Sequence, residues 1–87
     1  MASVKQAFET ALVDVKKLTT RPSNEVFLQL YALYKQGSQG DVEGKRPGFT
    51  DMIGRAKFDA WTACKGTSSN DAMQKYVELV KSLLAKE

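Results

Sequence analysis

Two tyrosines and a lysine lie within five positions of one another in the segment LYALYKQGSQGD, residues 30 to 41. Tyr31, Tyr34 and Lys35 are spaced i, i+3 and i+4, so a helix would project both rings and the ammonium group from one face. This face is a candidate binding surface. Two tyrosines that pack against neighbouring helices, with a lysine near a helix end, explain the same spacing equally well.

Residues elsewhere in the chain favour the binding interpretation. Tyr76 falls in the first turns of the last expected helix, Lys57 falls in the first turns of the third, and Lys45 and Arg46 lie in a glycine-rich loop. Lys16 lies where the first expected helix ends, and there a lysine is favoured by the helix dipole even without a ligand. Separate segments therefore supply aromatic rings and cations that a fold could bring together.

The residues that are missing exclude several kinds of site. The chain has no histidine, which removes the common general base and metal ligand. Cys64 is the only cysteine, so an internal disulfide and a multi-cysteine metal site are excluded, and its helical spacing predicts a small buried hydrophobe. The string GDVEGKR has the wrong glycine spacing for a P-loop and lacks the Ser or Thr that would bind magnesium. We therefore expect no catalytic residues and no metal site.

Length and composition indicate one domain over residues 1–87. The 87 residues are 43% hydrophobic and 26% charged, as in a small globular protein. A domain of this size offers a groove more readily than an enclosed chamber. Net charge is +3, too balanced for a typical nucleic-acid-binding chain. No segment is long and apolar enough for a membrane span or a secretory signal, so we expect a cytoplasmic protein.

Hydrophobic periodicity predicts an all-α fold with four helices. The expected helices span residues 3–18, 23 or 24 to about 37, 51–65, and from about 69 to the end of the sequence. Ser3 with Gln6, and Ser68 with Asp71, have the spacing of capping boxes. The third helix has an apolar stripe that includes Ile53 and Trp61, and Phe58 is also expected in the core. Residues 37–50 contain four glycines and form a long loop of the kind that often contributes to a binding site.

These residues resemble the acyl-CoA-binding protein family. The resemblance rests on YALYKQGSQGD (31–41), KRPGFTD (45–51), GRAKFDAWTACKGTS (54–68) and DAMQKYVELV (71–80), and it covers nearly the whole chain. It implies an up-down-down-up four-helix bundle. It also implies a function: non-covalent binding of long-chain acyl-CoA by an intracellular carrier that buffers the ester pool, without cofactor or catalysis.

The resemblance also implies which residues bind the ligand. Those expected at the coenzyme A head group are Lys16, Tyr31, Tyr34, Lys35, Lys57 and Tyr76. Phe27 and Leu28 are expected to line the acyl groove. Some positions depart from the common family pattern. Gly37 and Ser38 replace Ala-Thr, Arg55 replaces a lysine, Phe58 replaces a tryptophan and Leu12 replaces a small residue. Leu12 is expected to crowd the adenine, and Gly37 is expected to loosen the end of the second helix.

Other functions are compatible with the same residues. The surface formed by the tyrosines and lysines could bind an acidic peptide, as in a protein-interaction module. Alternatively, the chain could be the binding domain of an enzyme whose catalytic residues lie on another chain. Nucleic-acid binding is the weakest alternative, because the basic residues are scattered. The expected molecule is a monomer whose partners are long-chain acyl-CoA and, in brief contacts, membranes or acyl-CoA-using enzymes.

Overall fold

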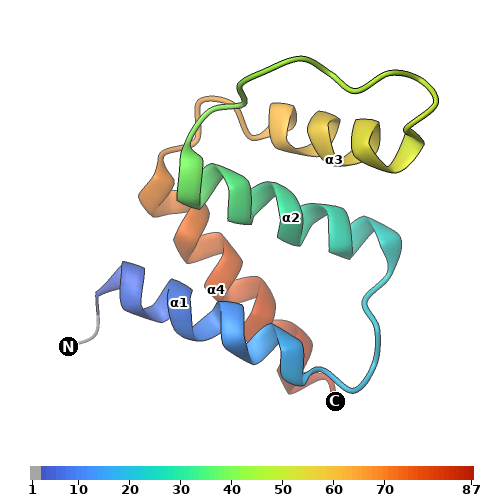
Figure 1. Cartoon of the computed structure of the whole chain (residues 1–87). Helices are drawn as coiled ribbons and strands as arrows, with labels where there is room; N and C mark the ends of the chain where they lie inside the picture. The colour runs from blue at the N-terminus through green and yellow to red at the C-terminus, as the bar shows by residue number, and fades with distance from the viewer. Residues whose placement is uncertain (1–2) are drawn as a thin grey trace.

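Four α-helices make up most of the computed structural model, which describes residues 3–87 (Figure 1). They are α1 (Val4–Asp14), α2 (Asn24–Gln39), α3 (Met52–Ala63) and α4 (Ser69–Ala85), and a 3-10 turn, η1 (Val15–Lys17), follows α1. No strand occurs among the described residues. Met1 and Ala2, which the expected domain includes, lie outside them.

Polar side chains begin all four helices. Ser3 and Gln6 form the complete capping box that the sequence predicts, whereas Ser68 accepts a hydrogen bond from the Asp71 N–H without a reciprocal bond from the Asp71 side chain. Ser23 and Asp51 accept from backbone N–H groups in the first turns of α2 and α3. Such bonds satisfy helix N–H groups that have no partner within the helix.

The helices run up, down, down and up, as expected (Figure 1). Helix α2 packs between α3 and α4, and α1 packs against the other side of α4, so the order across the molecule is α3, α2, α4, α1. Helices α2 and α3 are parallel, and the long segment between Gln39 and Met52 returns the chain to the end where α2 begins. The glycine-rich loop therefore permits the parallel pair.

The core lies where α1, α2 and α4 meet. Its buried residues are Phe8, Ala11, Leu30, Tyr76 and Val80. The rings of Phe8 and Tyr76 meet edge to face with their centroids 5.2 Å apart, a favourable aromatic geometry.

A buried glutamine holds the loops at the far end of α2. Gln36 is completely buried, and its Nε2 donates to the carboxylate of Asp41 at 2.8 Å and to the carbonyl oxygen of Thr67 at 2.7 Å. The same carboxylate accepts from the Gly66 N–H at 2.9 Å. The bond from Gly66, together with that from Gln36, lowers the Asp41 pKa. The loops before α3 and before α4 are thereby tied to α2.

The sequence Thr19-Thr20, between α1 and α2, is held by the carboxylate of Glu87. Thr19 donates its hydroxyl at 2.7 Å and its N–H at 2.9 Å, and Thr20 donates its N–H at 2.8 Å. The Thr19 hydroxyl bond is the largest cause of a lowered Glu87 pKa, and the two N–H bonds add to it. We call this contact the Glu87 clasp.

Several sequence expectations need correction. The first helix is shorter than residues 3–18 because its last turn tightens into η1, and α2 continues past Gly37 to Gln39. Ile53 does not belong to a buried stripe: it is 72% exposed at the start of α3, a helix whose main contacts are with α2 alone. Trp61 is buried as expected, whereas Phe58 is only half-buried.

Candidate functional site

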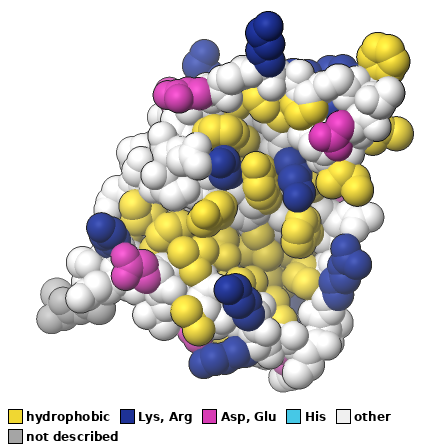
Figure 2. Space-filling model, viewed as in Figure 1, with side chains coloured by type: hydrophobic (Ala, Val, Ile, Leu, Met, Phe, Trp, Pro, Cys, Tyr) yellow, Lys and Arg dark blue, Asp and Glu magenta, His cyan; other side chains and the backbone are white. Residues whose placement is uncertain are grey.

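Two adjoining cavities open on the face shown in Figure 2, where hydrophobic side chains gather among lysines and arginines. The first, of about 400 Å³, lies among η1, α2, α4 and the link 18–23; we call it the tyrosine cavity. The second, of about 340 Å³, lies between the first turns of α2 and α3; we call it the α2–α3 groove. Arg21 and Phe27 line both, so the two spaces form one continuous surface.

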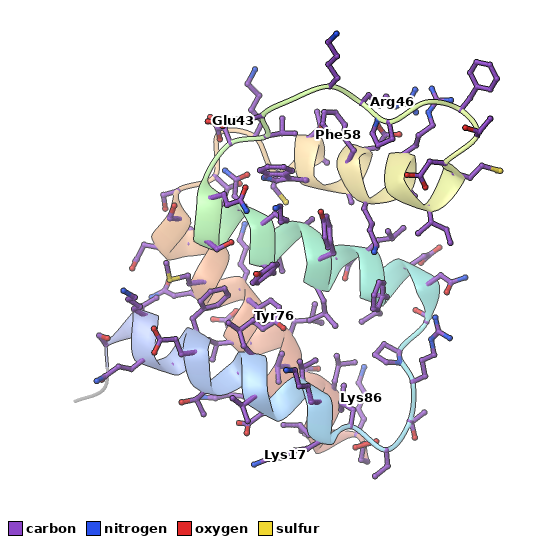
Figure 3. All side chains as sticks on the ribbon, in the orientation of Figure 1. Lys17, Glu43, Arg46, Phe58, Tyr76 and Lys86 are labelled. Atoms are coloured by element: carbon purple, nitrogen blue, oxygen red, sulfur yellow. The ribbon has the colours of Figure 1, made fainter. Side chains whose placement is uncertain are left out.

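Tyr31, Tyr34 and Tyr76 all line the tyrosine cavity. Tyr34 is 39% exposed, whereas Tyr76 projects from α4 between α1 and α2 and is buried against Phe8 (Figure 3). Burial, and secondarily the nearby Tyr34, raise the pKa of Tyr76, so its phenol is neutral at physiological pH. The three tyrosines of the sequence therefore meet at one surface, with one ring open to solvent and another fixed in the core.

The α2–α3 groove is mainly apolar. Its apolar lining residues are Phe27, Leu28, Met52, Ile53 and Ala56. Lys57 lies at its wall, with its Nζ 5.4 Å from the centre of the Tyr31 ring and 5.8 Å from that of Phe27. Lys57 thus stands where the apolar groove meets the tyrosine cavity.

The other two expected lysines lie beside the cavities. The Lys35 Nζ is 4.8 Å from the centre of the Trp61 ring, on the α3 side of α2, and Lys35 lines neither cavity. Lys16 is exposed on η1, next to Val15, which lines the tyrosine cavity. Its neighbour Lys17 pairs with Asp14 at 3.3 Å and points away from the cavities (Figure 3). Neither Lys35 nor Lys16 therefore lines either cavity in this structure.

Two of the departures from the family pattern, Leu12 and Gly37, take part in packing between the helices. Leu12 is half-buried, packs against the core, and lines neither cavity, so it does not crowd this surface. Gly37 is buried, and a Cβ atom there would lie 3.1 Å from Cγ of Met73. Its missing side chain allows α4 to approach α2, which is a packing role.

Arg21 is the cation lining this site that sequence reasoning missed, and the groove residues Met52, Ile53 and Ala56 were not predicted as site residues either. Arg21 is exposed in the link between α1 and α2 and lines both cavities. The link has no helical periodicity from which its direction could be inferred, and the only signal was a cation just before Pro22.

Chemical reactivity is low among the described side chains. Cys64 is half-buried, and burial raises the pKa of its thiol, which disfavours the nucleophilic thiolate. No group of three or more His, Cys, Asp or Glu side chains in residues 3–87 could hold a metal ion. None of the described helices has the length and apolar character needed to cross a membrane. The site is suited to binding an amphipathic molecule.

Comparisons with known proteins agree with this geometry. The family described as "Acyl CoA binding protein" matches residues 5–80. The acyl-CoA-binding protein homolog of Drosophila melanogaster is 49% identical over 83 residues, which are 95% of this chain and 96% of that protein. The acyl-CoA-binding protein of Brassica napus is 50% identical over 84 residues, covering 97% and 91% of the two chains.

A solved structure has the same fold. The crystal structure of Oryza sativa acyl-CoA-binding protein 2 superposes with a TM-score of 0.92 and 40% identity, and the match covers 97% of this chain and 93% of that one. Sequence, fold and surface lead to the same result. The chain belongs to the acyl-CoA-binding protein family.

Proposed function

We propose that this protein binds long-chain acyl-CoA esters without a covalent bond and serves as an intracellular carrier and buffer of them. The observation that carries the proposal is the continuity of the two cavities through Phe27 and Arg21, with Lys57 at their junction. Long-chain acyl-CoA has a phosphorylated nucleotide at one end and an apolar chain at the other. An aromatic and cationic space beside an apolar groove is complementary to both ends.

We assign the head group to the tyrosine cavity and its rim. In this assignment Tyr31 and Tyr34 offer aromatic faces, Tyr76 forms the floor, and cations surround the phosphates. The head-group residues are Lys16, Tyr31, Tyr34, Lys35, Lys57 and Tyr76, and Arg21 is added to them. Phe27 and Leu28 hold the start of the acyl chain in the α2–α3 groove.

The position of Lys57 suggests how it responds to ligand. Its ammonium group lies over the Tyr31 ring, and such a contact contributes about 0.5–1 kcal/mol at an exposed site. A charge-assisted hydrogen bond to phosphate contributes about 1.5–3 kcal/mol. The contact with phosphate is therefore more favourable than the contact with the ring, and Lys57 moves toward the phosphate. The Tyr31 ring is then free to stack on adenine, which adds roughly 1–3 kcal/mol.

The acyl chain adds a comparable contribution. Each methylene withdrawn from water contributes about 0.8 kcal/mol, so a few methylenes equal one lysine contact. We infer that both ends are needed for tight binding. We also propose that residues 1–87 act as a single monomeric domain that leaves the thioester intact, because the site offers no activated nucleophile or general base.

Calorimetric titration tests the proposal. Palmitoyl-CoA is compared with palmitate and with coenzyme A, and the ligand recovered from the complex is analysed by chromatography. We expect palmitoyl-CoA to bind more tightly than either part and to be recovered intact. Tight binding of palmitate alone, or hydrolysis of the thioester, would overturn the proposal. Failure to bind, together with capture of an acidic peptide by the same surface, would favour a protein-interaction module.

A further inference from the structure

A threonine that lines neither ligand cavity follows two lysines in the link between α1 and α2. The sequence there is Lys16-Lys17-Leu18-Thr19, so two cations precede the hydroxyl by three and two positions. Thr19 and both lysines are exposed. Protein kinases select substrates partly by charge, and a kinase with acidic residues in its substrate groove is complementary to cations at these positions. The segment is therefore a candidate substrate for such a kinase.

The segment needs little rearrangement to enter an enzyme groove. The lysines lie in η1, a single 3-10 turn, and the Leu18 N–H that closes this turn lies 3.4 Å from the carbonyl oxygen of Val15. Leu18 is already extended, with φ −60° and ψ 129°. The pair between Lys17 and Asp14 is exposed, and exposed ion pairs are weak. Such short turns open locally at low cost.

The Thr19 hydroxyl is also a donor in the Glu87 clasp. It donates to the Glu87 carboxylate at 2.7 Å, where the end of the chain lies beside the link (Figure 1). A phosphorylated threonine has lost the hydroxyl proton and carries about −1.5 to −2 charges at neutral pH. A phosphate on Thr19 would thus place one anion against another. The clasp depends on the state of this hydroxyl.

We propose that Thr19 is a phosphorylation site for a protein kinase that selects basic residues, and that its phosphate opens the Glu87 clasp. In the reaction, Oγ1 of Thr19 forms a bond to the γ-phosphorus of ATP. The bond from that phosphorus to the ADP oxygen breaks, ADP leaves, and the hydroxyl proton passes to a base of the kinase. Thr19 is favoured over Thr20, because Leu18 stands two positions before Thr20 in place of a cation.

Cations beside the clasp can receive the new phosphate. Arg21 and Lys86 line a small cavity of about 190 Å³ together with Glu87. Arginine pairs strongly with a phosphorylated side chain. Arg21 also lines both ligand cavities, so this pairing draws it away from the phosphates of a ligand. Phosphorylation should therefore weaken acyl-CoA binding. This consequence rests on the proposed function, whereas the modification and the opening of the clasp do not.

The first test is a kinase assay on the folded 87-residue chain. The chain is incubated with ATP and the catalytic subunit of cyclic-AMP-dependent protein kinase, an enzyme that selects basic residues before the acceptor. Mass spectrometry counts and locates the phosphate. The variants are Thr19→Val, Thr20→Ala and Lys17→Gln, and circular dichroism checks that each is folded. The matched control is Lys5→Gln, which removes an exposed lysine near the start of α1.

We expect one phosphate, located on Thr19. Thr19→Val should not be modified at this site, whereas Thr20→Ala and Lys5→Gln should be modified as the parent is. Lys17→Gln should be modified about ten-fold more slowly or less, because a charge-assisted contact with the kinase is lost.

The second test compares the modified protein with the unmodified one. Its melting temperature should be lower, and phosphorylation should lower the melting temperature less in Glu87→Gln, because the two changes act on the same contact. Calorimetry should show palmitoyl-CoA binding about ten-fold more weakly to the modified protein, because an arginine contact with phosphate is lost.

Several results would overturn the proposed site: absence of phosphate on Thr19 in the folded chain, modification of Thr19 only after unfolding, or an unchanged melting temperature after modification. Equal binding of palmitoyl-CoA before and after modification would overturn the effect on the ligand. A different result separates the two proposals. If the unmodified protein binds no palmitoyl-CoA, yet Thr19 is modified and the melting temperature falls, only the proposed function is rejected.

Discussion

At the scale of single residues, Lys57 and Tyr31 define the proposed head-group site most sharply. They come from different helices, yet the ammonium group of one lies 5.4 Å from the ring centre of the other. Neither is among the buried core residues. Their side chains are therefore available to a ligand with little consequence for packing.

Replacing either residue with alanine should weaken acyl-CoA binding and leave the fold intact. Loss of a charge-assisted phosphate contact or of a stacking surface should reduce affinity by about ten-fold or more. Calorimetry with palmitoyl-CoA measures the affinity, and circular dichroism measures the fold. Lys81→Ala, which removes an exposed lysine of α4 outside both cavities, is the control and should bind normally. Equal affinity for the ligand without its 3′-phosphate would contradict the proposed role of the cations.

Most of these residues were predictable because helical spacing fixes which side chains share a face. Tyr31 and Tyr34 follow from their spacing, and Tyr76 and Lys57 follow from the family motifs. Arg21 was not predictable, because spacing says nothing about where a residue of an irregular link points. The exposure of Ile53 was not predictable either, because the apolar stripe of a helix does not reveal which part of it a neighbour covers.

At the scale of elements, the Glu87 clasp fixes the link that forms one wall of the tyrosine cavity. Leu18, Arg21 and Pro22 line that cavity, and the hydrogen-bonded Thr19 and Thr20 lie between them. A contact between Glu87, which follows α4, and the link thus restrains the position of Arg21. Sequence patterns gave no sign of it, since its partners are 67 and 68 positions apart.

Glu87→Gln should lower the melting temperature at neutral pH, because the amide replaces an anion that accepts several hydrogen bonds. The Glu87 pKa is lower in the folded protein than its ordinary value of 4.5. The stabilisation is therefore complete above 4.5 and is lost as the pH falls through the lowered folded value. The difference in melting temperature between parent and variant should shrink in acid.

Thermal unfolding at a series of pH values measures this difference, and Glu78→Gln is the control because Glu78 is an exposed glutamate of α4, the helix that Glu87 follows. The other carboxylates with lowered pKa, Asp41 and Asp59, are present in every variant and cancel in the comparison. A difference that stayed constant into acid, or the same loss in the control, would contradict the clasp.

Gly37 shows how tertiary packing can override local helix propensity. Alanine should favour the helix by about 1 kcal/mol relative to glycine. Its Cβ, however, would lie 3.1 Å from Cγ of Met73, which must shift to make room. We expect the two effects to offset each other, so Gly37→Ala should change the free energy of unfolding by less than about 1 kcal/mol.

Gly37→Val provides the contrast, because its larger side chain overpacks the contact between α2 and α4. It should destabilise the protein by about 1–3 kcal/mol. Chemical denaturation measures both variants. If valine were tolerated as well as alanine, the close approach of Met73 would have no energetic consequence.

At the scale of the whole molecule, the serial order α3, α2, α4, α1 makes the inner and outer helices unequal. Helices α2 and α4 each pack against two neighbours, whereas the main contacts of α3 are with α2 and those of α1 are with α4. The fold class and helix order were predictable because the amphipathic pattern and family motifs cover nearly the whole chain. The unequal packing depends on contacts distant in sequence and needed the structure.

Amide hydrogen exchange should therefore be faster in α1 and α3 than in α2 and α4, because local opening costs less where fewer contacts are broken. A ligand that occupies both cavities touches η1, which follows α1, and the start of α3, so palmitoyl-CoA should slow exchange most in η1 and α3. Exchange followed by mass spectrometry measures this. Uniform protection of all four helices would indicate global stabilisation instead.

The position of Lys35 over Trp61 offers an intrinsic fluorescence signal for ligand binding. The indole is the only one in the sequence, its N–H is fixed to the carbonyl oxygen of Gly40 at 2.8 Å, and the Lys35 ammonium lies 4.8 Å from its centre. In the proposed head-group assignment, ligand phosphates draw the Lys35 charge away from the ring, so we expect the emission of Trp61 to change when the ligand binds. Lys35→Met, which keeps the aliphatic stem, should abolish the charge-dependent part of the signal.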